Sequence, residues 1–402
     1  MSYLVKAVSL IFLLIVIAIT AECAVVTSTH TNRKRPRPSN SPNSRIACDV
    51  SIRKNLPLNA PVFSKNGELE VPSGGVFEWE QHESVDVLCY DRNNKLVNTK
   101  RPQDAVQRYN GQRFRVGPSI TTISAIECEN KNTGDVEATK LPCAGSGLLR
   151  HVGFRSKTEF LKLYESCVDE AKAAVLYTHH KLYGTEIKSK TISKRVDFKS
   201  ESFPRSTNPR TAYTQNEQVD RLAKLLKSPS AAKKYVNATL FLQRGHLTPD
   251  GDQLLNTWQW ATYFYINVAP MWSTINTGSW KKLEETVREF ASRNRLTLDV
   301  YTGTDGVLQL QGVPFTLDRS NRIPVPRWLW KIVKHQNTAI VFVVSNNPFQ
   351  NDAFPCGSKN VGYNWLLSGV VEKMAFCTVA EARRHFKSIP SEAQASNVLK
   401  YK

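Results

Sequence analysis

Residues 237–249, NATLFLQRGHLTP, form the stretch that decides the fold. The first half is apolar and typical of a β-strand, which would end in the triplet Arg244-Gly245-His246. A lone histidine is more often structural than catalytic, and one triplet is a weak signal by itself. The triplet therefore becomes informative only together with the sequence that follows it.

A helix is predicted downstream, in the stretch NTGSWKKLEETVREF at residues 276–290. One of its faces can pack into a core, since it carries the apolar residues Leu283, Val287 and Phe290. A second stripe repeats every four residues and consists of Asn276, Trp280, Glu284 and Arg288. Taken alone, this stripe could contain no more than an exposed ion pair between its Glu and its Arg, worth about 0.3–0.5 kcal/mol.

The combined pattern resembles the DNA/RNA non-specific endonucleases of the ββα-metal (His-Me finger) group, especially their secreted arthropod members. In that family an Arg-Gly-His on a strand is followed about 30 residues later by an Asn at the head of a helix. Here His246 and Asn276 are 276 − 246 = 30 residues apart, and Asn267 precedes Asn276 by 276 − 267 = 9. The resemblance covers roughly residues 150–390 and implies an α+β fold, with mixed antiparallel sheets and helices.

The resemblance also implies a chemistry, the hydrolysis of phosphodiester bonds in DNA and RNA, double-stranded forms included. His246 would be the general base, since neutral imidazole is available near pH 7. Asn276 would be the one direct protein ligand to Mg²⁺, or to Mn²⁺ in its place, because such an ion keeps most of its water shell. Glu284 would hydrogen-bond the waters on the metal.

Other residues are expected to surround this centre. Arg244 and Arg288 would stabilise phosphate charge. Asn267 would hold the site residues in place without contacting the substrate or the metal ion. The expected nucleic-acid contacts are Arg195, Lys281 and Lys282.

Two positions depart from the family pattern. Bacterial members carry Asp immediately before Arg-Gly-His, where this chain has Gln243, and many members have Pro-Gln where this chain has Pro270-Met271. A carboxylate at the first position could orient the water shell of the metal ion, so its loss is expected to lower turnover. The four residues expected closest to the reaction are all present, which favours an active enzyme. They are Arg244, His246, Asn276 and Glu284.

The whole chain has 402 residues and a formal net charge of +19, from 54 Lys+Arg against 35 Asp+Glu. Its 41% hydrophobic and 22% charged residues exclude wholesale disorder. The charge favours polyanionic partners, and three functions follow. They are an endonuclease, a nucleic-acid-binding protein of the same fold with little or no nuclease activity, and a glycan- or membrane-surface binder. A glycan- or membrane-surface binder would leave the stripe of Asn276, Trp280, Glu284 and Arg288 unexplained. No membrane partner is therefore expected.

The N-terminus predicts secretion. Residues 1–23 contain Lys6, an apolar run at 7–19 and small residues, which is the pattern of a cleavable signal peptide. The run is shorter than the roughly 20 apolar residues of a membrane span, although a retained anchor is the alternative. Residues 24–46 are basic and lack acidic residues, so a disordered linker or a trimmed propeptide is expected.

Two domains should follow. Residues 47–145 show short alternating runs and Gly-containing turns, which predict a β-rich domain, and residues 146–390 should form the nuclease domain. In the latter, a capping box at 156–159 predicts a helix to about residue 171. The segments 298–301 and 307–310 flank a Gly-rich turn and predict a hairpin, and the apolar run at 339–344 predicts a buried strand.

The cysteines fit an oxidising compartment. No two of the eight have C-x-x-C spacing, so structural disulfides are expected, with pairing that the sequence does not give. Loss of Cys23 with the signal peptide would leave an odd count and one free thiol. Asn237-Ala238-Thr239 is the only sequon, and a glycan there would have to project away from the cleft.

Overall fold

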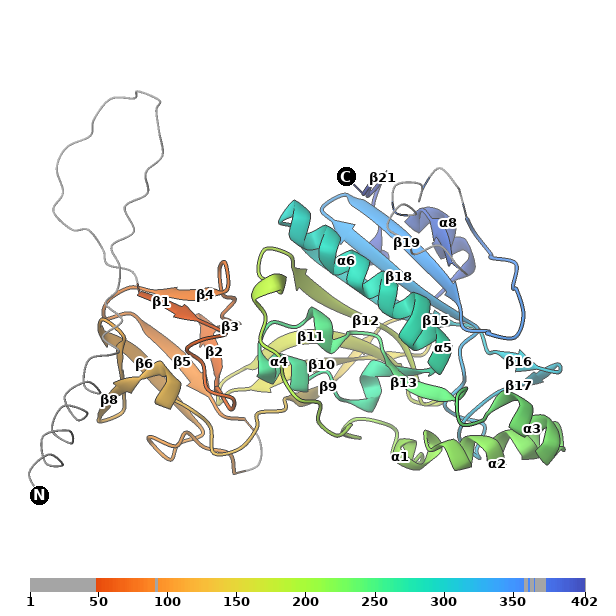
Figure 1. The fold of residues 1–402 in the computed structure, drawn as a ribbon, viewed down its shortest axis with the longest axis horizontal. Coiled ribbons are helices and arrows are strands. Elements are labelled where there is room, and N and C mark those ends of the chain that lie inside the picture. Colours follow the sequence, from red (N-terminus) through yellow and green to blue (C-terminus); the bar gives the residue numbers. More distant parts are fainter. Residues whose placement is uncertain (1–47, 91–92, 358–360, 362–364, 366–373, 402) are drawn as a thin grey trace, which may run out of the picture.

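The computed structural model describes residues 48–90, 93–357, 361, 365 and 374–401 (Figure 1). The predicted signal peptide and basic linker at residues 1–46 lie outside this range. Among the described residues, no helix is both long and apolar enough to cross a membrane.

The N-terminal part is built from strands around an aromatic core. Phe77 and Trp79 stack with ring centroids 5.3 Å apart, and Phe63 and Phe114 pack against them. A disulfide joins Cys89 to Cys128. The strands are β1 (Cys48–Ser51), β2 (Val62–Lys65), β3 (Glu68–Leu69), β4 (Val76–Trp79), β5 (Ser84–Leu88), β6 (Gln103–Asn110), β7 (Arg113–Val116) and β8 (Ser119–Thr122). They form a β1-β4 pair and a sheet of order β3-β2-β5-β6-β7-β8.

A nine-stranded sheet forms the centre of the larger part, with the order β20-β19-β18-β15-β12-β11-β10-β9 and β21 beside β19. All neighbours are antiparallel except β19 and β21. The strands are β9 (Asp135–Pro142), β10 (Leu148–Arg155), β11 (Phe160–Asp169), β12 (Ala174–Tyr183), β15 (Thr297–Asp305), β18 (Trp328–His335), β19 (Thr338–Ser345), β20 (Met374–Cys377) and β21 (Asn397–Val398). Because β9 starts 145 − 135 = 10 residues before the expected domain boundary at residue 145, this sheet begins earlier than the sequence pattern suggested.

Each face of this sheet packs into a separate hydrophobic core, and a different helix covers each core. Along the predicted buried strand β19, Ile340, Phe342 and Val344 belong to one core and the alternating residues to the other. The first core takes in the apolar stripe of helix α6 (Lys281–Asn294), which Figure 1 shows lying across the sheet. The second core is covered by α8 (Val379–His385).

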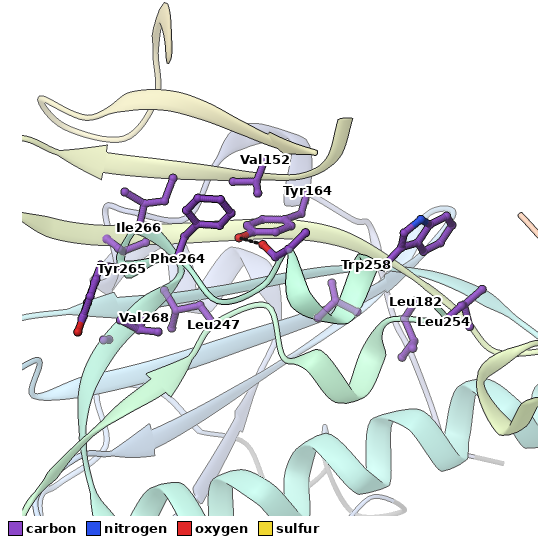
Figure 2. Packing of buried hydrophobic residues seen from close by; sticks show 14 of the residues in the cluster. Val152, Tyr164, Leu182, Leu247, Leu254, Trp258, Phe264, Tyr265, Ile266 and Val268 are labelled. Carbon is purple, nitrogen blue, oxygen red and sulfur yellow. Dashed lines mark hydrogen bonds between the residues drawn. The ribbon is translucent and has the colours of Figure 1, made fainter. Parts of the chain in front are cut away.

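A β-hairpin-like pair and a helix lie on the α6 face. Strand β13 (Leu242–His246) pairs with β14 (Val268–Trp272), and α4 (Asn256–Trp260) lies between them in the chain. Figure 2 shows the packing beneath them, where the Tyr164 hydroxyl donates to the carbonyl of Ala261 at 3.1 Å. The order strand, strand, helix confirms the expected α+β fold. The remaining helices and short strands are α1 (Pro209–Ala212), α2 (Gln215–Leu226), α3 (Pro229–Tyr235), α5 (Ser273–Ile275), β16 (Gln309–Leu310) and β17 (Val313–Pro314).

The helix predicted after the capping box is wrong. Phe160–Asp169 is the strand β11, paired on both sides with β10 and β12. The Ser156 hydroxyl does accept hydrogen bonds from the Thr158 and Glu159 amides, but they close a turn before the strand. A spacing of four residues, as between Phe160 and Tyr164, suits a strand equally well because four is an even number.

The hairpin predicted across residues 303–306 is also wrong. β15 runs through Gly303 and pairs with β12 and β18, while β16 pairs with β17. Gly303 serves close packing, since a Cβ there would lie 2.2 Å from the Trp330 ring and 2.5 Å from the Leu176 carbonyl oxygen. Only Gly306, with φ of +66°, has a conformation that favours glycine in a turn.

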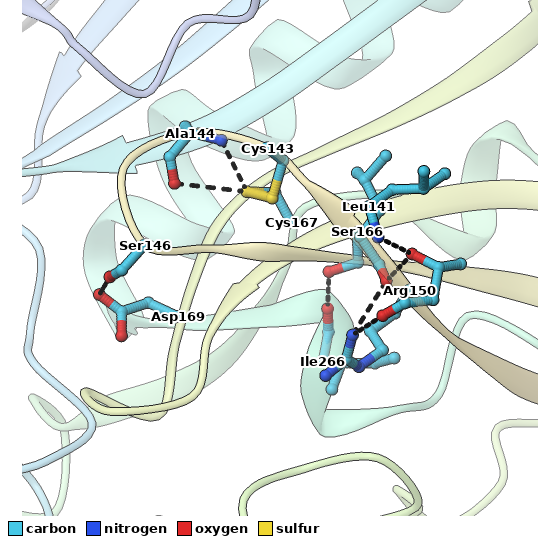
Figure 3. Close-up of a disulfide and its surroundings, with 11 residues drawn as sticks. Leu141, Cys143, Ala144, Ser146, Arg150, Ser166, Cys167, Asp169 and Ile266 are labelled. Carbon is cyan, nitrogen blue, oxygen red and sulfur yellow. Dashed lines mark hydrogen bonds between the residues drawn. A yellow bond between two sulfur atoms is a disulfide. The ribbon is translucent and has the colours of Figure 1, made fainter.

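The described cysteine side chains are all in disulfides. Besides the N-terminal bond, Cys143 joins Cys167 and Cys356 joins Cys377. Figure 3 shows the first of these closing the loop between β9 and β10 onto β11. Structural disulfides are therefore confirmed for these six residues. The question of a free thiol concerns Cys23 and the side chain of Cys48, which lie outside the described part.

Candidate active site

His246 ends β13 and lies in an aromatic setting. Tyr263 packs edge-on against its ring at 4.9 Å, and Phe198 lies at 5.2 Å. Its Nε2 is buried and has no hydrogen-bond partner in the described part of the chain. The ring makes a hydrogen bond to the backbone of Thr262. Because Nε2 has no partner, this bond is made by the other ring nitrogen, Nδ1. Burial lowers the pKa of His246, which favours a neutral ring with a free acceptor at Nε2.

Asn276 lies next to the strand, at the start of a π-helical turn η5 (Asn276–Trp280) that precedes α6. Within this turn Gly278 has the non-helical angles φ −99° and ψ −111°, so Asn276 is offset from the regular helix that carries Glu284. The Nδ2 of Asn276 donates to Oε1 of Gln243 at 2.8 Å. This bond leaves the Oδ1 of Asn276 free to bind a cation.

Gln243 and Met271 thus take on definite structural roles. They face each other across the β13-β14 pair, and Gln243 orients Asn276 through a neutral amide contact. Met271 is fully buried and packs over Gly245, where a Cβ would lie 2.2 Å from its sulfur. The triplet therefore needs glycine at its centre because the methionine side chain occupies that space.

Arg244 points into an aromatic cage. Its Nε donates to the Tyr265 hydroxyl at 3.0 Å, and its guanidinium lies 5.5–5.7 Å from the ring centroids of Tyr213, Tyr265 and Phe198. No carboxylate lies within ion-pair distance of it in the described chain, so the charge remains available to an anionic ligand.

Arg288 binds Asp252 and not Glu284. Its Nη1 lies 2.8 Å from Oδ1 of Asp252, whose other oxygen is 3.0 Å from Nε2 of His180. Burial alone would raise the pKa of Asp252, but the bond to His180 and the charge of Arg288 lower it below its usual value. The alternative of an exposed ion pair within the helix is therefore wrong, and Arg288 instead forms an ion pair between α6 and the loop after β13.

Glu284 is half-buried on α6 and makes no hydrogen bond or close ion pair with any other described residue. Burial raises its pKa to about 7, Asp252 adds to this, and the charges of Lys331 and Arg288 oppose it. Lys331 is only 1% exposed, donates to the Thr302 hydroxyl at 2.6 Å and lies over the Trp280 ring. A carboxylate without a direct partner beside a buried cation can accept hydrogen bonds from bound water.

Asn267 is completely buried and fully bonded. Its Nδ2 donates to the carbonyls of Thr248 and Thr262, and its Oδ1 accepts from the Thr248 amide, all within 2.9 Å. It therefore does not face a ligand directly. It fixes the backbone at Thr262, which in turn holds the His246 ring.

The three expected nucleic-acid contacts are placed differently. Arg195 is exposed, its guanidinium makes no hydrogen bond to a described residue, and its charge acts on both His246 and Asp250. Lys281 and Lys282 are exposed at the beginning of α6, and Lys281 lies 3.9 Å from Glu285. No contact joins these two lysines to the cluster around His246 in the described part of the chain.

Sequence reasoning missed Asp250, Tyr263 and the buried pair His180–Asp252. Asp250 accepts a hydrogen bond from the Tyr263 hydroxyl at 2.6 Å, and its charge acts on His246. Asp250-Gly251-Asp252 follows the triplet by only four residues, so the two acidic residues in that short loop were a usable signal. His180 comes from β12, and nothing in its sequence surroundings points to the site.

The residues fit a hydrated divalent cation better than a cage of ligands. Among the described residues, no group of three or more His, Cys, Asp or Glu side chains could hold a metal ion. The candidate groups are one free amide oxygen, one carboxylate without a partner and one neutral imidazole, from Asn276, Glu284 and His246. Mg²⁺ takes few protein ligands and keeps several waters, which such a set can bind by hydrogen bonds.

Comparison with known proteins shows the family of this chain. The family described as DNA/RNA non-specific endonuclease matches residues 147–368, more than half of the chain. A salivary endonuclease of Lutzomyia longipalpis is 31% identical over 81% of this chain and 77% of its own, and one of Culex quinquefasciatus is 30% identical over 75% of each. Salivary protein Tsal2A of Glossina morsitans morsitans is 22% identical over 98% of this chain and 100% of its own.

A chain in a solved structure of the EndoG/EndoGI complex is 17% identical, with a TM-score of 0.33 over 62% of this chain and 91% of that chain. The family match and the two salivary endonucleases cover the region that holds β13, β14 and α6. The chain belongs to the DNA/RNA non-specific endonuclease family.

Proposed function

We propose that this protein is a secreted, Mg²⁺-dependent endonuclease that hydrolyses phosphodiester bonds of DNA and RNA, including double-stranded forms, without sequence preference. The observation that carries the proposal is the partner-free Nε2 of a neutral His246, together with the free oxygen of Asn276. The naming of two relatives as salivary endonucleases and the disulfides of this chain support both the activity and secretion.

In this proposal His246 acts as the general base. Its Nε2 takes a proton from water while the water oxygen forms a bond to phosphorus, and the bond to the leaving oxygen of the nucleic acid breaks. The backbone of Thr262, held by Asn267, keeps the ring in the required orientation. Burial keeps the ring unprotonated, so it is ready to accept a proton at neutral pH.

The other residues bind and orient. Asn276 would hold a divalent cation through Oδ1 while Gln243 fixes its amide, and Glu284 would accept hydrogen bonds from the ion's waters. Such an ion supplies positive charge that stabilises the transition state and the leaving oxygen. Arg244 and Arg195 would bind phosphate oxygens, since both guanidinium groups are free of carboxylates.

A cleavage assay tests the proposal. Purified protein should degrade plasmid DNA and a folded RNA in Mg²⁺, and EDTA should stop both reactions. Gel shifts without cleavage would mean that the chain is a nucleic-acid-binding protein of this fold. Absence of both cleavage and binding would contradict the proposal entirely.

A further inference from the structure

An irregular segment, residues 186–199, lies between the N-terminal domain and the proposed active site. Apart from one short 3-10 turn and the bridge from Lys199 to Phe264, it has no regular secondary structure. Its middle is bonded to the larger part of the chain: the Thr191 amide donates to the Leu254 carbonyl at 2.8 Å, and the Ser193 hydroxyl donates to Oε1 of Gln259 at 2.7 Å. The segment carries two cations of the site, Lys190 and Arg195. A segment without its own ladder of hydrogen bonds must be held in place by its neighbours.

The N-terminal domain holds one end of this segment. Arg53 donates from Nε to the carbonyl of Lys190 at 2.9 Å and from Nη2 to that of Lys188 at 2.7 Å. The Gly74 amide donates to the Glu186 carboxylate at 3.1 Å. The two surfaces are so close that a Cβ on Gly75 would lie 2.4 Å from the Cβ of Ser189.

The chain between the two domains holds the other end. The Lys199 ammonium donates to the carbonyls of Thr133 and Gly134, each at 2.8 Å, and lies 3.8 Å from the centre of the Phe264 ring. Both ends of segment 186–199 are thus bonded to residues that precede the large sheet in the chain.

The segment in turn contacts the loop that carries the acidic residues of the site. Lys190 donates to the carbonyl of Gly251 at 2.5 Å. On either side of Gly251, Asp250 acts on His246 and Asp252 binds Arg288. Arg288 also packs closely over this loop, since a Cβ added to Gly251 would lie 2.9 Å from its Nη1. A shift of the loop would move Asp252 and with it the guanidinium that Asp252 binds.

We propose that the N-terminal domain positions the active site, with Arg53 as the positioning residue that acts through Lys190 on the loop 250–252. Arg53 itself touches no residue of the reacting centre. Its two bonds fix the backbone from which the Lys190 side chain reaches the loop. The effect on catalysis rests on the proposed function, whereas the effect on the loop does not.

The test compares Arg53→Ala with Lys54→Ala in the full-length protein. Lys54 is the adjacent residue, is also exposed and makes no side-chain hydrogen bond or ion pair with a described residue, so it controls for the lost charge. Amide hydrogen exchange should become about 10-fold faster at residues 187–192 and 250–253 in Arg53→Ala and should not change in Lys54→Ala. The value of kcat should fall several-fold in Arg53→Ala alone, and Arg53→Lys should recover part of it because it restores one of the two bonds.

Equal exchange in the two alanine variants would overturn the proposal. So would faster exchange in Arg53→Ala without any change in kcat or KM, because the contact would then be only a domain interface. If the wild-type protein does not cleave nucleic acid, the proposed function fails on its own. Exchange at residues 250–253 then decides the positioning role separately.

Discussion

Replacing Glu284 with Gln should make the metal-free protein more stable above neutral pH. The pKa of this carboxyl is raised by burial to about 7 in the folded chain, from a usual value of 4.5. The folded state therefore holds a proton that the unfolded state has already lost between these two values. The stability that comes from this proton is fully present below pH 4.5 and disappears as the pH rises through 7.

The size of the effect follows from the two pKa values. Their difference of about 2.5 corresponds to at most about 3.5 kcal/mol, at about 1.4 kcal/mol for each pKa unit. The carboxylate is half-buried and lies near the charges of Lys331 and Arg288, so we expect about 1–2 kcal/mol. For a domain of this size, that raises the Tm by about 2–6 °C.

The assay is thermal unfolding in EDTA between pH 4.5 and 8.5. The Tm of Glu284→Gln minus that of wild type should be constant near pH 4.5, increase toward pH 7 and level off above it. Glu285→Gln is the matched control, because Glu285 is the next residue on α6 and is exposed. A difference for Glu284→Gln that stays flat over this range, as it should for Glu285→Gln, would refute the argument.

Three further predictions concern binding and turnover. His246→Ala should reduce cleavage by about 10²–10⁴-fold with nearly unchanged affinity, because a general base acts in the transition state; wild-type turnover in single-turnover assays would disprove the assignment. Affinity for DNA should fall by roughly 10³–10⁵ between 50 and 200 mM salt if 6–10 phosphates are bound, and a flat titration by fluorescence anisotropy would contradict a phosphate-dominated interface. Asn237 is exposed and its side chain closes a turn with Thr239 and Leu240, so mass spectrometry should find a glycan there in protein from a secreting host, and a large gain in affinity after deglycosylation would show that the glycan does face the cleft.

The core of the site was predictable because it is local in sequence. β13, β14 and α6 lie within about fifty residues, and their apolar patterns and the spacing of His246 and Asn276 depend on short-range geometry. The apolar stripe of α6 is buried as predicted. The family resemblance also marked Gln243 and Met271 as departures from the pattern, although it did not show that Gln243 would bond to Asn276.

The features that the sequence did not predict depend on contacts between residues that are far apart in the chain. The local pattern offered Arg288 only one possible partner, Glu284 one turn away, whereas its actual partner Asp252 is 36 residues distant in the chain. Lys331 and His180 reach the site from β18 and β12, and strand pairing brings them there. The same cause explains β11, since pairing on both sides outweighed a local pattern that also suited a helix.

The order of strands at one edge of the large sheet has a consequence for protein synthesis. β19 is apolar, and the partners on its outer edge, β20 and β21, come from the last thirty residues of the chain. While the ribosome is still making those residues, β19 would present an unpaired, aggregation-prone edge. The large sheet can therefore be completed only after residues 374–398 have left the ribosome. Until then the nascent chain holds an unfinished sheet, and a chaperone that covers the edge of β19 would limit aggregation.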